Sequence, residues 1–308
     1  MDARNINTQI REYLAHCQYE KNLSPKTLKA YEIDLRQFVS FIGEERCAYS
    51  KEILQLYIAH LQNRYKIKSV KRKIASLKAF FNYLEYEELL EINPFSKMRI
   101  KLHEPFLIPR TIPLAVVDKL LHCVYHKKST DIEKDNQYRS DLRDIAVIEL
   151  LFATGIRVSE LCSLKPELVD LTEGTVKIYG KGSKERMIHI GNENVLSALK
   201  AYHNAFSDKI NTTGWFFVNC RGYQLSDQSV RFMIKKYTDM AGIDLHVTPH
   251  MFRHAFATLL LEEDVDIRYI QQLLGHSSIV TTQIYTHVAS KKQRDILIAK
   301  HPRNKINL

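Results

Sequence analysis

The sequence predicts a mainly α-helical protein with a small antiparallel β-sheet, arranged as two domains. Apolar residues recur at helical spacing through residues 1–98, whereas alternation with a period of two is confined to residues 175–190. A stretch with three prolines, residues 99–113, lies between these regions. At roughly 150 residues per domain, a chain of 308 residues has room for about two domains. We therefore expect a helical domain over 1–98, a linker over 99–113 and an α+β domain over 114–308.

The first domain is predicted to contain four helices. Their apolar stripes occupy four windows, which are Ile6–Leu14, Leu28–Ile42, Ile53–Leu61 and Val70–Leu84. Ser24 and Pro25 supply an N-cap and a proline at the first helical position, which together mark the start of the second helix. Gly43 ends that helix, and Asn93-Pro94 closes the set.

The second domain is predicted to mix helices with a β-hairpin. The expected helices are Leu142–Ala153, Val158–Leu164, Ser226–Ala241, Pro249–Glu262, Ile267–Leu274 and Val280–Val288. Thr175–Tyr179 and Arg186–Ile190 form the hairpin around a glycine-containing turn, and Trp215–Val218 is expected to add a third strand. We expect His126–Asp141 to be a polar loop and Lys291–Leu308 to be a basic tail.

Composition restricts the class of protein. The 45 Lys and Arg residues exceed the 35 Asp and Glu residues by 10, which favours a polyanionic partner such as nucleic acid. No apolar run approaches the ~18–20 residues of a membrane span, and the first residues do not resemble a signal peptide. The five cysteines are scattered, without a CxxC pair, so neither a disulfide framework nor a zinc knuckle is indicated. A cytoplasmic location is expected.

One segment of the helical domain carries charge of a single sign. No Asp or Glu occurs from Ile53 to Leu84. A solvated face usually carries both signs, whereas a row of cations matches the spaced phosphates of a duplex. The candidate DNA-binding residues are Arg64, Lys66, Lys68, Lys71, Arg72, Lys73 and Lys78. Such contacts provide affinity and do not specify a base sequence.

Candidate catalytic residues occur in five motifs. The motifs are Ala153–Leu161 (ATGIRVSEL), Gly180–Arg186 (GKGSKER), Thr248–His254 (TPHMFRH), Leu274–Ser277 (LGHS) and Thr281–His287 (TTQIYTH). His250 and Arg253 stand three residues apart, so they share a face of a helix N-terminus, where an anion is favoured. Each motif alone has an ordinary structural explanation, such as a capping histidine, a surface arginine or a packed tyrosine.

In combination, these motifs resemble the tyrosine recombinase (phage-integrase-like) family, most closely its short Xer-like members. Leu23–Thr27 with Tyr31 and Asp34-Leu35 also resembles the family's helical core-binding (SAM-like) domain. The resemblance implies a two-domain DNA clamp, in which the helical domain is joined to a catalytic domain that ends in a C-terminal tail. The length of the polar loop His126–Asp141 leaves room for a mobile-element integrase.

The resemblance also implies the reaction and the site residues. A site-specific recombinase of this family cleaves and rejoins DNA through a 3′-phosphotyrosyl intermediate and a Holliday junction, without metal, ATP or other cofactor. The implied catalytic residues are Arg157, Lys181, His250, Arg253, His276 and the nucleophile Tyr285. Their chemistry fits these roles, because forked guanidiniums clamp phosphate oxygens and an imidazole can take the phenolic proton.

Several alternatives stay open at the level of sequence. Lys184 shares the hairpin turn and could replace Lys181. Glu160 is either a carboxylate that supports Arg157 or a plain surface residue. Structural roles are expected for other residues near the motifs, namely His254, His287, Tyr179, Tyr237 and Tyr269. The competing functions are a type IB topoisomerase and a catalytically silent DNA-binding protein.

Partners are expected from the resemblance as well. Four protomers would assemble on two DNA sites, and the tail with Ile296–Ile298 would dock on a neighbouring protomer. A second recombinase or an accessory protein is a further expected partner. No membrane association is expected, and the protein is expected at the nucleoid.

Overall fold

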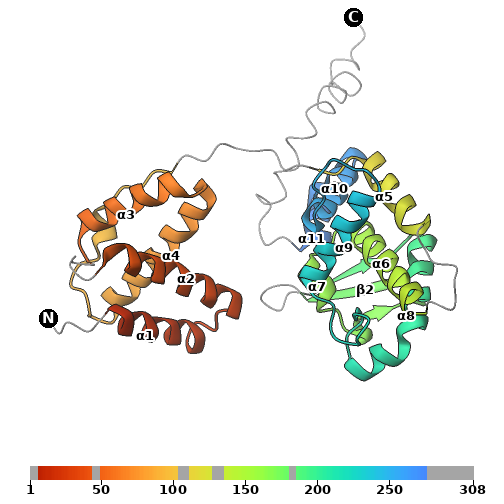
Figure 1. Cartoon of the computed structure of the whole chain (residues 1–308), viewed down its shortest axis with the longest axis horizontal. Helices are drawn as coiled ribbons and strands as arrows, with labels where there is room; N and C mark the ends of the chain where they lie inside the picture. Colours follow the sequence, from red (N-terminus) through yellow and green to blue (C-terminus); the bar gives the residue numbers. More distant parts are fainter. Residues whose placement is uncertain (1–5, 44–48, 103–110, 127–134, 180–184, 276–308) are drawn as a thin grey trace, which may run out of the picture. The chain divides into compact units, whose positions relative to one another are not determined.

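The computed structural model describes residues 6–43, 49–102, 111–126, 135–179 and 185–275 (Figure 1). The chain forms two compact units, Met1–Phe106 and Leu107–Leu308. Each unit has its own buried core. The predicted mainly helical fold with a small antiparallel sheet is confirmed. No helix among the described residues is both long enough and apolar enough to cross a membrane.

The described part of the first unit contains four helices and a short 3₁₀ helix. They are α1 (Ile6–Tyr19), α2 (Pro25–Ile42), α3 (Lys51–Arg64), α4 (Ile67–Tyr86) and a 3₁₀ turn at Pro94–Lys97. Helix α4 contacts each of the other three helices, so its apolar face organises the unit. Aromatic rings fill the core, and Phe38, Phe80 and Phe81 are fully buried. The Ser24 hydroxyl accepts the N–H of Thr27 at 3.3 Å, which confirms the predicted N-cap.

The described residues of the second unit form a three-stranded antiparallel sheet and a set of helices, and one face of the sheet is buried. The helices are α5 (Leu114–His126), α6 (Asp135–Thr154), α7 (Val158–Cys162), α8 (Glu193–Thr213), α9 (Asp227–Met240), α10 (Pro249–Glu262) and α11 (Ile267–Leu274). The strands are β1 (Val169–Asp170), β2 (Thr175–Tyr179) and β3 (Glu185–His189), in the order β1-β2-β3. Val176 lies opposite Ile188 in the register of β2 and β3, and both side chains are buried.

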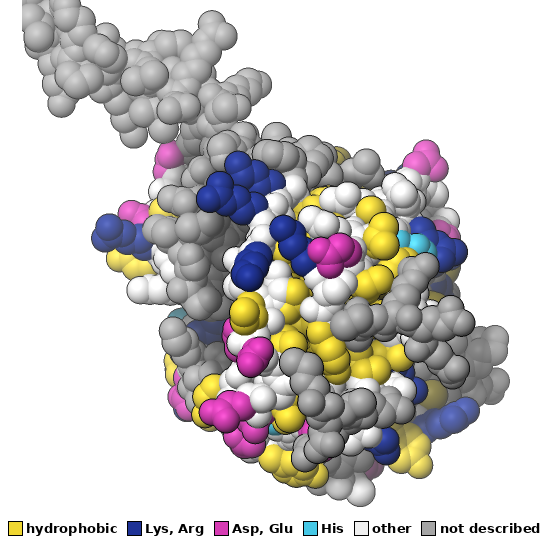
Figure 2. All heavy atoms as spheres, turned by 90° about the vertical axis from the view of Figure 1, so that its left-hand side faces the viewer, with side chains coloured by type: hydrophobic (Ala, Val, Ile, Leu, Met, Phe, Trp, Pro, Cys, Tyr) yellow, Lys and Arg dark blue, Asp and Glu magenta, His cyan; other side chains and the backbone are white. Residues whose placement is uncertain are grey.

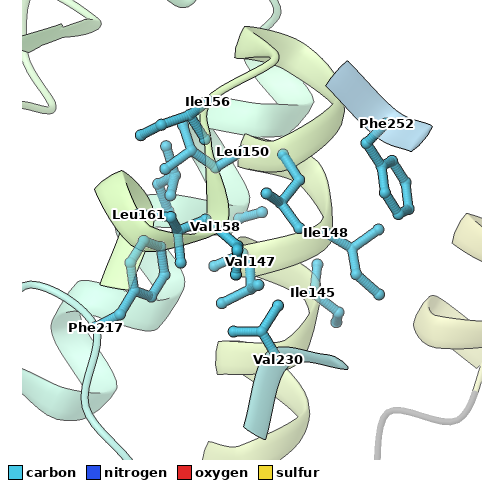
Figure 3. Close-up of a cluster of buried hydrophobic side chains, with 14 of the residues drawn as sticks. Ile145, Val147, Ile148, Leu150, Ile156, Val158, Leu161, Phe217, Val230 and Phe252 are labelled. Carbon is cyan, nitrogen blue, oxygen red and sulfur yellow. The ribbon is translucent and has the colours of Figure 1, made fainter. Parts of the chain in front are cut away.

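Helix α6 forms the centre of this unit. It contacts α5, α8 and α10, and Figure 3 shows its apolar side chains leaving it on more than one side. Ile148 of α6 and Phe252 of α10 belong to the same buried cluster as Phe217 and Val230. A helix that is apolar around most of its circumference is stable only in a core. The end of α6 is therefore held firmly, and this is where the first catalytic motif begins.

Two predictions about this unit are wrong. Trp215–Val218 forms no strand, because the Phe216 N–H donates to the Leu164 carbonyl and Val218 makes only an isolated bridge with Gln224. The third strand is β1 instead. The predicted polar loop His126–Asp141 is also too long, because α6 already begins at Asp135. The predicted helix at Val280–Val288 and the tail lie outside the described residues.

Candidate active site

Arg253 joins three of the sequence motifs. It lies one turn into α10, and its side chain is almost fully buried. Its Nη1 donates to the carbonyl of Gly155 at 2.8 Å, and its Nη2 donates to the carbonyl of Leu274 at 2.5 Å. Gly155 precedes Arg157 by two residues, and Leu274 begins the fourth motif. A buried guanidinium bound to two carbonyls thus fixes the loop after α6 and the end of α11 to α10.

The loop after α6 can approach α10 this closely because residue 155 is a glycine. Gly155 has a φ of +58°, in the left-handed region that disfavours other residues. A Cβ atom at this position would lie 2.7 Å from Cδ1 of Phe256. The glycine of the ATGIR motif therefore has a packing role, and the position of Arg157 depends on it.

Arg157 is held by Glu160 at the start of α7. The Arg157 N–H donates to Oε2 of Glu160 at 2.9 Å, and its Nη1 donates to Oε1 at 2.7 Å. The Arg157 side chain is 34% exposed, whereas that of Glu160 is only 9% exposed. Of the two readings left open for Glu160, the structure supports the carboxylate that contacts Arg157.

Arg186 also belongs to this cluster, although its sequence motif did not single it out. Arg186 of β3 contacts both oxygens of Glu160, with Nη2–Oε2 at 2.6 Å and Nη1–Oε1 at 3.1 Å. Burial raises the pKa of Glu160, but hydrogen bonds from Arg186 and Arg157 outweigh burial and hold the pKa below its ordinary value. Glu160 is therefore an ionised carboxylate between two guanidiniums.

His250 lies in the first turn of α10, near the same positive charges. Partial burial lowers its pKa below the ordinary value of 6.5, and Arg231, Arg253 and Arg157 lower it further. The imidazole is therefore mainly neutral at pH 7, as a proton acceptor must be. Arg231 of α9 is a second residue that the sequence analysis missed, since no motif marks it.

The structure thus brings together three of the six predicted catalytic residues, Arg157, His250 and Arg253. The other three, Lys181, His276 and Tyr285, lie outside the described residues, as do Lys184 and His287. Among the described residues, no group of three or more His, Cys, Asp or Glu side chains is placed to hold a metal ion.

The other described phenols differ in their surroundings. Tyr237 is buried and donates to Oδ2 of Asp144 at 3.1 Å, as expected of a structural residue. Tyr179 and Tyr269 are 49% and 65% exposed, so the packing role expected for them is not observed. His254 is partly buried on α10 beside Arg253, and its pKa is lowered by burial and by electrostatic interaction with His250 and Arg253.

The basic window, which we define as Ile53–Leu84, lies on α3, α4 and the turn between them, and most of its cations are exposed. The exposed members are Arg64, Lys66, Lys68, Lys71, Arg72 and Lys78. On the face of the molecule in Figure 2, basic side chains (dark blue) and acidic side chains (magenta) both occur. The single sign of charge is therefore a property of the Ile53–Leu84 window rather than of the whole surface.

Lys73 departs from the prediction for this window. It is 3% exposed, and its Nζ lies 3.0 Å from Oδ1 of the fully buried Asp34 and 4.8 Å from the centre of the Tyr65 ring. Arg72 and Ser76 also donate to Asp34, at 2.5 and 2.9 Å. Lys73 thus belongs to a buried cluster that joins α4 to α2, and it is not a surface cation.

A cationic cluster beside a neutral imidazole, in a mainly helical unit that follows a basic helical unit, is suited to hold a phosphate of DNA. Residues 124–292 match the phage integrase family, and residues 10–88 match the phage integrase N-terminal SAM-like domain. The chain belongs to the phage integrase family, as a tyrosine-type site-specific recombinase, which confirms the resemblance found in its sequence.

Named relatives cover nearly the whole chain. A tyrosine recombinase of Agathobacter rectalis is 55% identical over 300 residues, which are 97% of this chain and 98% of the relative. Tyrosine recombinase XerC of Bacillus subtilis is 34% identical over 310 residues, with 97% and 98% of the two chains covered.

Solved structures share the fold. The crystal structure of XerA recombinase aligns with a TM-score of 0.54 at 28% identity, covering 96% of this chain and all of that one. The post-cleavage complex of XerH site-specific recombinase with palindromic difH substrate aligns with a TM-score of 0.75 at 20% identity, covering 94% of this chain and 84% of that one.

Proposed function

We propose that Arg157 and Arg253 clamp the scissile DNA phosphate while Tyr285 attacks it. The hydrogen bonds from Arg253 to Gly155 and Leu274 carry this proposal. Because Gly155 lies two residues before Arg157, these bonds tie the segment of Arg157 to the helix of Arg253. In the transition state, negative charge develops on the non-bridging oxygens. Preorganised guanidiniums stabilise that charge with forked donors.

Proton transfers complete the proposed step. The Tyr285 oxygen forms a bond to phosphorus as the bond to the 5′ oxygen breaks. His250 accepts the phenolic proton, and its lowered pKa supports this role. Lys181 protonates the leaving 5′ oxygen, and His276 donates a hydrogen bond to the phosphate.

The product of this step is a 3′-phosphotyrosyl ester that conserves the energy of the phosphodiester bond. A 5′ hydroxyl can therefore reseal the strand by the reverse reaction, without ATP. Charge neutralisation by two guanidiniums supplies what a metal ion supplies in other phosphoryl-transfer sites, so the proposed mechanism uses no cofactor.

DNA contact by the first unit belongs to the same proposal. Six exposed cations of the basic window bind backbone phosphates, and they are Arg64, Lys66, Lys68, Lys71, Arg72 and Lys78. Lys73 is left out because its ammonium is buried against Asp34. Binding through these residues should weaken steeply as salt increases.

Assembly on DNA is proposed on the same basis. Four copies synapse two sites and exchange strands through a Holliday junction, each docking its tail, residues 291–308, on a neighbour. A lambda integrase tetramer bound to a Holliday junction, which has this fold at 16% identity, supports the arrangement. A second recombinase or an accessory protein would join at this stage, in the cytoplasm at the nucleoid.

A nicked suicide substrate tests the proposal. Cleavage releases the short 5′ strand, so the covalent protein–DNA adduct accumulates. Tyr285→Phe should abolish the adduct while DNA binding is retained, and Tyr269→Phe, which alters an exposed phenol of α11, should form it normally. Adduct formation by Tyr285→Phe would show that another residue is the nucleophile. Relaxation of supercoiled DNA without paired sites would favour the topoisomerase alternative.

A further inference from the structure

Arg186 binds two elements of the catalytic cluster at once. Its guanidinium forms a two-pronged ion pair with Glu160, and its Nε donates to the carbonyl of Leu273 at 2.9 Å. Its side chain is only 9% exposed. Arg186 therefore connects β3 with the start of α7 and with the last turn of α11.

The ion pair with Arg186 fills the hydrogen-bonding capacity of Glu160. Oε1 accepts from Nη1 of Arg157 and Nη1 of Arg186, while Oε2 accepts from the Arg157 N–H and Nη2 of Arg186. A carboxylate has about four lone-pair sites. Since all are occupied, Glu160 cannot turn to form its own two-pronged pair with Arg157. Within the described residues, the Arg157 guanidinium is held by one nitrogen, and its other donors stay available to a phosphate.

Arg186 also packs against the turn that leads to residue 276. A Cβ atom on Gly275 would lie 3.0 Å from Nη1 of Arg186, and Gly275 has a φ of +64°. The two last carbonyls of α11 thus accept from two different guanidiniums, Leu273 from Arg186 and Leu274 from Arg253. The end of α11 is fixed to the same charged cluster that orients Arg157.

We propose that Arg186 is a positioning residue for strand cleavage: it holds Glu160 so that the Arg157 guanidinium presents its free donors to the scissile phosphate. This inference rests on the proposed phosphate clamp. Arg186 itself does not touch the phosphate. Its loss lets Glu160 draw Arg157 into a two-pronged pair, and the donors aimed at the phosphate are then lost.

The test compares Arg186→Met and Arg186→Lys with a matched control in the full-length protein. Lys177→Met is that control, because it removes the exposed 2.7 Å ion pair with Glu185 on the same hairpin and leaves Glu160 untouched. Strand cleavage is measured on two suicide substrates. One has an ordinary phosphate at the cleavage position, and the other has a methylphosphonate at that position. The methylphosphonate has lost the negative charge that Arg157 stabilises, so it measures how much each defect depends on that charge.

We expect Arg186→Met to slow cleavage of the ordinary phosphate by about 10²-fold, the loss typical of a catalytic group displaced by about 1 Å. On the methylphosphonate, the cleavage rate of Arg186→Met should lie within about threefold of the wild-type rate. Arg157→Ala, which removes the clamping guanidinium, should show the same recovery. Arg186→Lys keeps the charge but cannot span both Glu160 oxygens, so it should fall between wild type and Arg186→Met. DNA affinity and the Lys177→Met control should be unchanged.

Equal slowing on both substrates, or recovery of full rate at low temperature, would overturn the inference, since either result indicates a purely structural role. If Arg186→Met fails to fold, the same comparison with Arg186→Lys decides the question. A wild-type protein that forms no adduct, or an adduct that persists in Tyr285→Phe, would instead refute the proposed function, so the two failures are distinguishable.

Discussion

The buried carboxylate of Asp34 allows a quantitative test of how the helical unit is held together. Asp34→Asn keeps the shape of the side chain but removes its charge, so the Lys73 ammonium, 3% exposed, would face a neutral amide. Removing one partner of a buried ion pair costs about 3–5 kcal/mol. Arg72 contributes little to this cost, because its side chain is 48% exposed and its charge is screened by solvent. We therefore expect the helical unit to lose about 3–5 kcal/mol of stability.

Hydrogen exchange is the suitable assay, because the single tryptophan, Trp215, lies in the other unit. At 1.4 kcal/mol per tenfold, the amides of α2 and α4 should exchange roughly 10²- to 4 × 10³-fold faster in Asp34→Asn. Unfolding followed by Trp215 fluorescence should be unchanged. Adding Lys73→Met should restore most of the protection by removing the orphaned charge. An acceleration below about tenfold would refute the reasoning that Asp34 neutralises a buried ammonium.

Three further predictions concern the catalytic unit. Arg157→Lys keeps the charge but loses the forked donors, so adduct formation should fall by about 10²-fold at unchanged DNA affinity; an unaltered rate would contradict the clamp. Arg231→Gln removes a charge that lowers the His250 pKa, so an NMR titration of His250 should give a higher pKa. The fall of the cleavage rate in acid, which lies below pH 6.5 in wild type, should then move to higher pH. An unchanged titration would exclude this coupling. Gly155→Ala should cost about 1–3 kcal/mol in backbone strain, before any clash with Phe256, and should shift unfolding followed by Trp215 fluorescence to lower denaturant.

The helical unit was predictable because each of its helices carries its own apolar stripe. Helix α8 carries the same information, with Val195, Leu199, Tyr202, Phe206 and Ile210 at helical spacing, although it was not predicted. Such patterns are local, so each helix can be read from its own residues. The start of α6 was not readable in this way.

The first turns of α6 are polar, and their partners are supplied only by the folded chain. Gln137 donates to Asp141 at 2.7 Å, and Tyr237 of α9 donates to Asp144. Asp141 and Asp144 are both buried by this packing. A polar stretch looks like a loop until these contacts are known, which explains the prediction of an overlong loop.

The identity of the candidate catalytic residues was readable from motifs, whereas their support was not. Arg186 meets Glu160 across 26 positions of sequence, and Arg253 meets Gly155 across 98. No periodicity reports contacts of this kind, because they depend on how β3 and α10 pack against the start of α7. Lys73 was predicted to bind DNA but is buried, since composition alone cannot separate a buried lysine from the exposed ones around it.

The described cluster carries an unbalanced charge. Three guanidiniums, Arg157, Arg186 and Arg253, and the carboxylate of Glu160 give the cluster a charge of 3 − 1 = +2 while His250 is neutral. Arg231 and Asp227, which also act on His250, carry opposite charges and leave this sum unchanged. Packing holds these like charges together, and their mutual repulsion opposes folding. An anion that enters the site relieves this repulsion. Oligonucleotide or sulfate should therefore raise the temperature at which the catalytic unit melts.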